Sequence, residues 1–401
     1  MGAQSTIDSQ DLLNRASSLF GLLRKNVAEA DAMRRLPDEN IDALQQADLL
    51  KVWVPRRYGG FEAPIQTQIN LSAEIARACP STGWVFANLT TLSAIACLLS
   101  QKAQDEIFGA DGNALVCGVL LPGGTASPSA TKTTDGYRVS GEWPFASGSL
   151  HATWTGLGVP IIENGQMVDL ALMLFPRADL EIRDTWFTVG MRGTGSNTFV
   201  AHDVFVPTHR TLPLMGPSGA IEGSTLTEHR SESLYRVPLG ALLRLGLSGP
   251  ALGIALAAQE AFLEGPSKRS IPYTTYQSRS EAPSIQIALA NADTKREIAV
   301  LLVQRAAAEA QRFAVDGDFP DLRTRVRIAN DTAYAMSLAK ESLDLLIAAA
   351  GSSSMAESSF LQYSFRDLST VVLHGIFRPT MTLEMYGRVL CGLSPGISTI
   401  F

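Results

Sequence analysis

Two aromatic residues and several hydroxyl groups are packed into one short stretch of this sequence, SGEWPFASGS, at residues 140–149. Trp143 and Phe145 flank Pro144, and Gly and Ser residues lie at both ends. Gly, Ser and Pro disfavour a helix and are typical of turns and edge strands. We therefore expect a non-helical segment. The rest of the sequence must show whether its large rings and hydroxyl groups contact a ligand or only the protein core.

His374 is the second residue whose type and position could do chemistry. It lies in the apolar stretch STVVLHGIF, downstream of Arg366 and Asp367. A lone histidine on an apolar helix can simply be a core residue, or its imidazole can exchange protons near neutral pH. The stretch alone leaves both interpretations open.

Several common binding and catalytic motifs are absent from the sequence. The Gly-rich stretch GMRGTGS, residues 190–196, lacks GxGxxG spacing and precedes a predicted strand instead of a helix. Neither a Walker lysine motif nor a GxSxG nucleophile motif occurs. The five histidines show no metal-ligand spacing, so we expect no metal site.

The composition is that of a folded, acidic protein. Of 401 residues, 46% are hydrophobic and 18% are charged, and the formal net charge is -6. This balance favours a large core and disfavours nucleic acid or an anionic membrane as a partner. Scattered cysteines and an N-terminus without a secretory signal predict a cytoplasmic protein with reduced thiols. We expect no apolar run near the roughly 20 residues that span a bilayer.

The hydrophobic pattern divides the chain into three expected domains. Residues 1–115 have helical periodicity, as at Leu12, Ala16, Leu19 and Leu23. Residues 116–227 contain short runs rich in Gly, Thr, Val and aromatics between turn residues, which is typical of an antiparallel barrel or sandwich. Residues 228–401 return to long helical patterns suited to a bundle. The order predicts an α+β fold.

Five strings in this order resemble the acyl-CoA dehydrogenase fold, and more narrowly its flavin-dependent monooxygenase branch, the oxygenase halves of two-component systems. The resemblance covers essentially the whole chain. It implies an N-terminal helical domain, a central antiparallel β-barrel or sandwich and a C-terminal four-helix bundle. The strings are STGWVFA (81–87), LLPGGTA (120–126), SGEWPFASGS followed by His151, GMRGTGS followed by VFVP (204–207), and FRDLSTVVLHG (365–375) followed by YGRVLCG (386–392).

This resemblance implies that SGEWPFASGS passes a flavin ring. Phe145 matches an aromatic residue that relatives place against the ring, and Ser147 matches a hydroxyl near ring nitrogen 5. Pro122, in LLPGGTA, is assigned to the cofactor site as well. Reduced FAD or FMN that takes up O₂ forms a 4a-hydroperoxyflavin, which a dry, hydrogen-bonded pocket must protect. The alternative is that Trp143 and Phe145 are ordinary core and Ser147 a turn residue.

The resemblance also implies a catalytic role for His374. The monooxygenase branch carries a histidine here that faces flavin and substrate. The dehydrogenase branch has a Tyr-Glu-Gly-Thr string whose glutamate removes a substrate proton, and here Leu373, His374 and Gly375 stand in its place. Some dehydrogenases carry that glutamate on another helix. We expect His374 to accept a substrate proton or to donate one to the departing peroxide oxygen.

Further cofactor contacts are implied at five positions. Arg269 resembles an arginine that relatives extend to the flavin phosphate of a neighbouring subunit, and Gln286 and Gly351 fall where the fold contacts the distal part of the cofactor. Arg192 and Thr194 are expected to add polar contacts. The plain alternatives are an exposed charge for Arg269 and a helix C-cap for Gly351.

The predicted substrate residues are Trp84, Asn88, Leu92 and His151. Relatives that act on simple phenols often carry a histidine about eight residues after the GW tryptophan, where this chain has Leu92. A more apolar pocket favours a larger substrate, such as a polycyclic or indole-type natural product. His151 would line the same cavity or merely end a strand.

The resemblance therefore implies an oxygenase that takes reduced flavin from a separate NAD(P)H:flavin reductase and uses O₂ to hydroxylate an aromatic substrate. We expect a homo-dimer or homo-tetramer, since Arg269 should serve a neighbour. The alternatives are an N-hydroxylase of an amine or amino sugar, an acyl-CoA dehydrogenase, or a helical scaffold that has lost the flavin.

Overall fold

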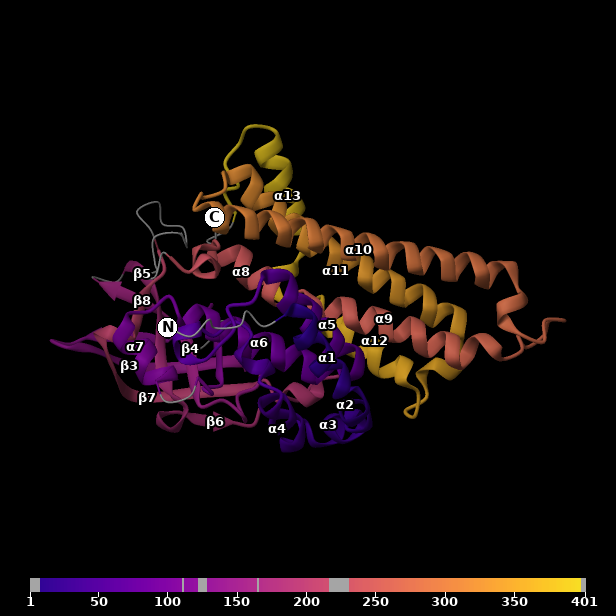
Figure 1. Cartoon of the computed structure of the whole chain (residues 1–401), viewed down its shortest axis with the longest axis horizontal. Helices are drawn as coiled ribbons and strands as arrows, with labels where there is room; N and C mark the ends of the chain where they lie inside the picture. The colour runs from indigo at the N-terminus through magenta and orange to yellow at the C-terminus, as the bar shows by residue number, and fades with distance from the viewer. Residues whose placement is uncertain (1–7, 110–111, 122–127, 164–165, 216–230, 398–401) are drawn as a thin grey trace.

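The computed structural model describes residues 8–109, 112–121, 128–163, 166–215 and 231–397. Helices come first along the chain, strands follow, and helices return (Figure 1). The strands and the N-terminal helices lie at one end of the molecule, and the long C-terminal helices extend away from them. Pro122 falls outside the described residues.

Seven α-helices precede the sheet in the described residues. The most buried of them is α6, in which all 17 residues are buried because the helix is apolar on every side. It packs closely on α5, since a Cβ added at Gly83 would lie 2.4 Å from the Ala76 Cβ. The helices are α1 (Ser9–Ser18), α2 (Phe20–Lys25), α3 (Val27–Met33), α4 (Asp38–Gln46), α5 (Ile65–Ala78), α6 (Pro80–Ala96) and α7 (Gln101–Phe108).

The strands form one sheet in the order β6-β7-β3-β2-β4-β5-β8, with β1 paired to β4. Among the described strands, β1–β4 and β2–β4 are parallel and the other pairs are antiparallel. The expectation of a purely antiparallel region is therefore wrong at two pairs, because the alternation of side chains reports the face of a strand and not its neighbour. The strands are β1 (Val116–Val119), β2 (Ser129–Lys132), β3 (Gly136–Ala146), β4 (Trp154–Glu163), β5 (Gln166–Pro176), β6 (Glu181–Arg183), β7 (Asn197–Pro207) and β8 (Thr211–Pro213).

The C-terminal helices pack as the resemblance implied. Helix α9 contacts α10, α11 and α12, and α11 contacts α10 and α12, while α8 joins the bundle to α6 and α13 packs on α11. Asp321 caps the start of α11, and Gly317 ends α10 with φ +79°, a conformation that glycine adopts without strain. The helices are α8 (Leu239–Gly246), α9 (Gly249–Glu264), α10 (Pro283–Asp316), α11 (Leu322–Ala350), α12 (Phe360–Val371) and α13 (Pro379–Leu390).

The segment Leu239–Lys268, which contains α8 and α9, is long and apolar enough to cross a membrane by length and composition alone. This corrects the expectation that no apolar run approaches that length. Within the fold, 94% of its most apolar window is buried. Helices α5, α6, α11 and α12 cover it, so its hydrophobic surface is used inside the chain.

Candidate functional site

The end of β3 turns one of its two aromatic rings outward. Residues two apart on a strand share a face, so Trp143 and Phe145 should point the same way. The register with β7 slips between Trp143 and Ala146, and Phe145 has φ +69°, which is uncommon for a residue with a Cβ. Trp143 is fully buried against Phe175, whereas Phe145 is 66% exposed. Trp143 is therefore an ordinary core residue, and Phe145 is not.

Phe145 packs edge-on against Trp186, with ring centroids 5.8 Å apart and an interplanar angle of 83°. The Trp186 Nε1 donates to the Met191 carbonyl at 2.9 Å, which fixes the indole. Phe187 and Val189, in the same turn, are also exposed. An exposed aromatic on strained backbone beside other exposed apolar residues marks a binding surface. Sequence reasoning missed Trp186, although a large aromatic in a polar turn is a usable signal.

Ser147 belongs to a chain of buried hydroxyl groups. Its Oγ accepts from Trp84 Nε1 at 3.0 Å and lies 2.8 Å from Ser196 Oγ. Ser196 Oγ lies 2.7 Å from Thr194 Oγ1, which donates to the Met191 carbonyl at 2.8 Å. The structure thus joins three predicted site residues, Trp84, Ser147 and Thr194. They come from α6, from the turn after β3 and from the turn before β7.

His374 lies beside Trp84, just after α12. The two ring centroids are 5.5 Å apart at 63°, and the His374 Nδ1 accepts from the Ile376 backbone N–H at 3.4 Å. That bond assigns the ring hydrogen to Nε2. Desolvation by surrounding protein lowers the pKa of His374 to about 4. The residue as a whole is nevertheless exposed, and water partly stabilises the charged form, but the direction of the shift leaves the imidazole neutral near pH 7.

Asp367, on α12, ties this helix to the hydroxyl chain. Its Oδ1 accepts from the Met191 backbone N–H at 2.5 Å. Burial raises the pKa of Asp367 to about 7, against the opposing effects of the Met191 N–H and Arg366. The carboxyl group thereby holds the residue whose carbonyl ends the hydroxyl chain. The signal in the sequence is an acidic residue on the same helix face as Leu368 and Val371.

Arg192 is engaged within the chain. Its Nε donates to the Asp31 carbonyl at 3.1 Å and lies 3.6 Å from the Asp31 carboxylate, and its Nη1 donates to the Thr188 carbonyl at 3.1 Å. These bonds attach the turn to α3. A cofactor contact by Arg192 stays a prediction.

The remaining predicted substrate residues differ in position. Asn88 and Leu92 are buried on the same face of α6 as Trp84, and Asn88 Nδ2 donates to the Trp84 carbonyl at 2.8 Å. His151 turns toward α4, with its Nδ1 3.5 Å from an Asp38 carboxylate oxygen. Burial is the main cause that lowers the pKa of His151. The expected roles of these three residues toward a substrate stay predictions.

The loop from α9 to α10, the start of α10 and the end of α11 lie at the opposite end of the bundle from the strands (Figure 1), and these segments carry Arg269, Gln286 and Gly351. The Arg269 carbonyl accepts from the Arg279 backbone N–H at 2.8 Å, and the Arg279 side chain lies beside Gly351. Gln286 Nε2 donates to the Ser280 carbonyl at 2.9 Å. Arg269 is exposed, and no carboxylate of the described residues pairs with it. The structure thus brings these residues together with each other but not with Ser147.

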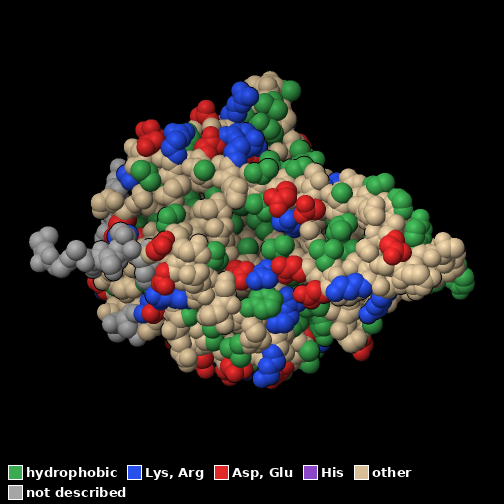
Figure 2. All heavy atoms as spheres, turned by 45° about the vertical axis from the view of Figure 1, so that its right-hand side comes forward, with side chains coloured by type: hydrophobic (Ala, Val, Ile, Leu, Met, Phe, Trp, Pro, Cys, Tyr) green, Lys and Arg blue, Asp and Glu red, His purple; other side chains and the backbone are tan. Residues whose placement is uncertain are grey.

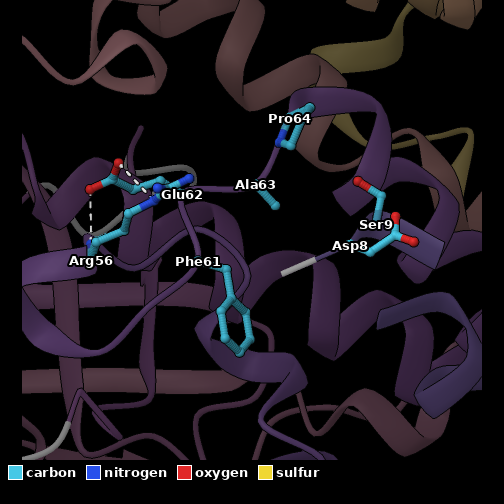
Figure 3. Close-up of a pocket in the computed structure, with 7 residues that line it drawn as sticks. All are labelled: Asp8, Ser9, Arg56, Phe61, Glu62, Ala63 and Pro64. Atoms are coloured by element: carbon cyan, nitrogen blue, oxygen red, sulfur yellow. Dashed lines mark hydrogen bonds and ion pairs between the residues drawn. The ribbon is translucent and has the colours of Figure 1, made fainter. Parts of the chain in front are cut away.

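A hollow of about 440 Å³ lies elsewhere, between the start of α1 and residues 56–64 (Figure 3). Two of its charged residues pair with each other, since Glu62 accepts from the Arg56 backbone N–H at 2.8 Å and lies 3.7 Å from the Arg56 side chain, and the third, Asp8, accepts from the Gln10 backbone N–H at 3.1 Å. None of the predicted site residues lines it. Over the described ranges no cluster of three His, Cys, Asp or Glu residues could hold a metal ion.

Comparison with known proteins decides the family. The models "Acyl-CoA dehydrogenase, N-terminal domain" and "Acyl-CoA dehydrogenase, C-terminal domain" match residues 21–107 and 245–379. The flavin-dependent monooxygenase oxygenase subunit HsaA of Rhodococcus jostii (strain RHA1) is 32% identical over 382 residues, covering 95% of this chain and 98% of that protein. The chain belongs to this family of flavin-dependent monooxygenases. It is therefore an oxygenase component that uses reduced flavin.

Two further relatives of this monooxygenase carry ligand information in their names. The structure of XiaF from Streptomyces sp. in complex with FADH2 and glycerol has a TM-score of 0.90 and 30% identity, covering 98% of both chains. The indole-3-acetate monooxygenase of Pseudomonas putida is 26% identical over 374 residues, covering 93% of this chain and 91% of that protein.

The residues of this monooxygenase fit a reduced flavin at the end of β3. Phe145 offers an exposed aromatic face, and the Ser147 hydroxyl, which has two hydrogen-bond partners, can make one further hydrogen bond beside it. Trp84 and His374 close the same region from α6 and from the end of α12. An aromatic wall with one well-placed polar group is typical of a flat cofactor site.

Proposed function

We propose that this oxygenase component hydroxylates an aromatic substrate of the polycyclic or indole type at the site formed by Phe145, Ser147, Trp84 and His374. The observation that carries this proposal is the meeting of these residues from three separate elements, with Phe145 held outward by a strained backbone. When bound, reduced flavin supplies the electrons that reduce one oxygen atom of O₂ to water while the other atom enters the product. A separate NAD(P)H:flavin reductase would provide that flavin.

The chain's own residues would hold the cofactor and move one proton. Phe145 would pack on the ring, and Ser147 would bond a ring nitrogen while the buried surroundings exclude water. His374 is neutral near pH 7 with its Nε2 bearing hydrogen, so Nε2 can donate a hydrogen bond to a leaving oxygen but keeps its proton, because a neutral imidazole is a very weak acid. The proton that His374 can move is a substrate proton accepted at Nδ1, which must first release the Ile376 N–H.

The wall of α6 favours an apolar substrate. Leu92 is buried, and the one amide among the predicted substrate residues, Asn88, donates to its own helix. Leu92 therefore offers a phenolate no donor, and Asn88 has one of its two amide hydrogens bound to the Trp84 carbonyl. The name of the indole-3-acetate relative adds support for a bicyclic aromatic substrate.

We also propose that a neighbouring subunit completes the cofactor site. Arg269 presents an exposed cation in the loop between α9 and α10, at the far end of the bundle from the strands (Figure 1), and such a cation suits the phosphates of another chain's flavin. Apolar side chains gather on the projection formed by α13 and are scattered among charged groups on the bundle (Figure 2). Ile287, Ile298 and Leu301 of α10 are among the exposed ones. These surfaces favour at least a dimer.

All four cysteines are free, which fits the cytoplasm.

The test supplies reduced FAD or FMN from an unrelated reductase and offers indole, a polycyclic phenol and a simple phenol with isotopically labelled O₂. We expect one labelled oxygen atom in the indole or polycyclic product, and no NADH oxidation by this chain without the reductase. Faster conversion of the simple phenol would refute the substrate class. Consumption of reduced flavin with no labelled product from any of the three would refute aromatic hydroxylation.

A further inference from the structure

We propose that Thr194 and Ser196 fix the direction of the Ser147 hydroxyl, so that Ser147 can only accept a hydrogen bond from the flavin and thereby favours the reduced cofactor over the oxidised one. This deepens the proposed function and rests on it, because it requires Ser147 to lie beside ring nitrogen 5. Thr194 and Ser196 would be positioning residues, since they act through Ser147.

The direction is set first at the Met191 carbonyl. A carbonyl oxygen has no hydrogen and can only accept, so the 2.8 Å contact with Thr194 Oγ1 uses the single hydroxyl hydrogen of Thr194. The same carbonyl accepts from Trp186 Nε1 at 2.9 Å. Asp367 holds the Met191 N–H, which keeps this residue in place.

The direction then passes along the hydroxyl groups. Because the Thr194 hydrogen is used, its 2.7 Å contact with Ser196 must be filled by the Ser196 hydrogen. The Ser196 Oγ is then an acceptor, so the 2.8 Å contact with Ser147 uses the Ser147 hydrogen.

The other end of the chain agrees with this direction. An indole nitrogen is only a donor, so Trp84 Nε1 fills one lone pair of Ser147 Oγ at 3.0 Å. Ser147 then has one free lone pair and no free hydrogen. Trp84, Ser147, Thr194 and Ser196 are all buried, so water is not at hand to supply a substitute partner.

This arrangement distinguishes the two redox states of a flavin. Ring nitrogen 5 carries a hydrogen in the reduced isoalloxazine and a lone pair in the oxidised one. If Ser147 can only accept, its Oγ accepts a hydrogen bond from the ring nitrogen of the reduced flavin. Against the oxidised flavin, the Oγ lone pair faces the lone pair of the ring nitrogen and no hydrogen bond forms. Leaving a buried polar group unpaired costs more than an ordinary hydrogen bond gains, so the preference should be large enough to measure.

The experiment compares Thr194→Val, Thr194→Ser, Ser196→Ala and Ser147→Ala with the wild type. Thr198→Val is the matched control, because the Thr198 hydroxyl is buried nearby and bonds Thr185 at 2.8 Å, outside the chain. The dissociation constants of oxidised and anaerobically reduced FMN and FAD are measured by titration, together with the midpoint potential of the bound flavin. No turnover is needed.

We expect Thr194→Val to lower the ratio of reduced to oxidised affinity by about tenfold, because Ser196 can then return its hydrogen to Ser147 and free the Ser147 hydrogen for the ring. For a two-electron couple, tenfold corresponds to a potential lower by about 30 mV. Ser196→Ala should act in the same direction. Thr194→Ser and Thr198→Val should keep the wild-type ratio.

Two different failures can be told apart. If Ser147→Ala changes the ratio but Thr194→Val and Ser196→Ala do not, Ser147 lies at the flavin and the directing role of its neighbours is refuted. If Ser147→Ala leaves the ratio at its wild-type value, Ser147 does not bond ring nitrogen 5, and both the proposed site and this inference are wrong.

Discussion

Replacing Asp367 by Asn should change how the stability of the protein depends on pH. Burial raises the pKa of Asp367 from 3.8 to about 7, so between these values the folded protein keeps a proton that the unfolded chain has lost. The folded state binds more protons there, and its stability must therefore fall as pH rises from about 4 to 7 and level off above. The amide introduced by Asp367→Asn cannot ionise, so it removes this dependence while keeping an oxygen for the Met191 N–H.

The size of the effect follows from the shift. With a pKa of 3.8 in the unfolded chain and about 7 in the folded protein, the free energy of unfolding of the wild type should fall by about 2.5 kcal/mol between pH 5 and pH 8. The difference in unfolding free energy between Asp367→Asn and the wild type should thus move by about 2.5 kcal/mol in favour of the variant.

Urea unfolding at both pH values, at one protein concentration, measures this difference. Other titrating groups, His374 among them, are present in both proteins and cancel. A difference that stays constant within about 0.5 kcal/mol would refute the raised pKa and with it the buried, protonated Asp367 at low pH.

Three further outcomes are expected. With reduced flavin at saturating concentration, Ser147→Ala should release several-fold more hydrogen peroxide per product, since one hydrogen bond is worth about 1 kcal/mol. Ser149→Ala, which loses only a bond to the Gly195 carbonyl, should stay coupled. His374→Ala should slow product formation about 10²-fold without weakening flavin binding. Because the pKa of His374 is lowered, protonation of this residue should cause no loss of the wild-type rate near pH 6.5. If the substitution leaves the rate of product formation unchanged, His374 is a packing residue. Gly190→Ala should destabilise the folded protein by about 2 kcal/mol or more, because the new Cβ would lie 2.0 Å from the Arg366 carbonyl oxygen. Gly21→Ala, whose Cβ would have nothing within 4 Å, should leave the stability unchanged or raise it. Equal unfolding midpoints for the two variants would contradict this packing.

The sequence predicted the order of elements and the family because both depend on local signals. Helical periodicity, short runs between turn residues and five ordered strings are visible without any tertiary contact. The parallel pairing of β4 with β1 and β2 was not predictable, since it depends on which strands meet after folding.

The site was predictable in part for the same reason. Phe145, Ser147 and His374 stand in recognisable strings, but their partners come from distant segments. Trp84 lies 63 residues from Ser147 and Asp367 lies 176 residues from Met191, so neither bond has a signature in spacing. The outward turn of Phe145 depends on a bulge in β3 that alternation cannot reveal.

The burial of α6 limits how this enzyme can acquire new substrates. Its 17 residues all lie inside the protein, and among them are the three that we assign to the substrate wall. A substitution that reshapes that wall therefore also changes the volume of the core, and a smaller side chain at Leu92 would cost about 2–5 kcal/mol of stability. Descendants with altered selectivity should carry compensating enlargements in the helices around α6, and a library that varies α6 alone should return mostly poorly folded proteins.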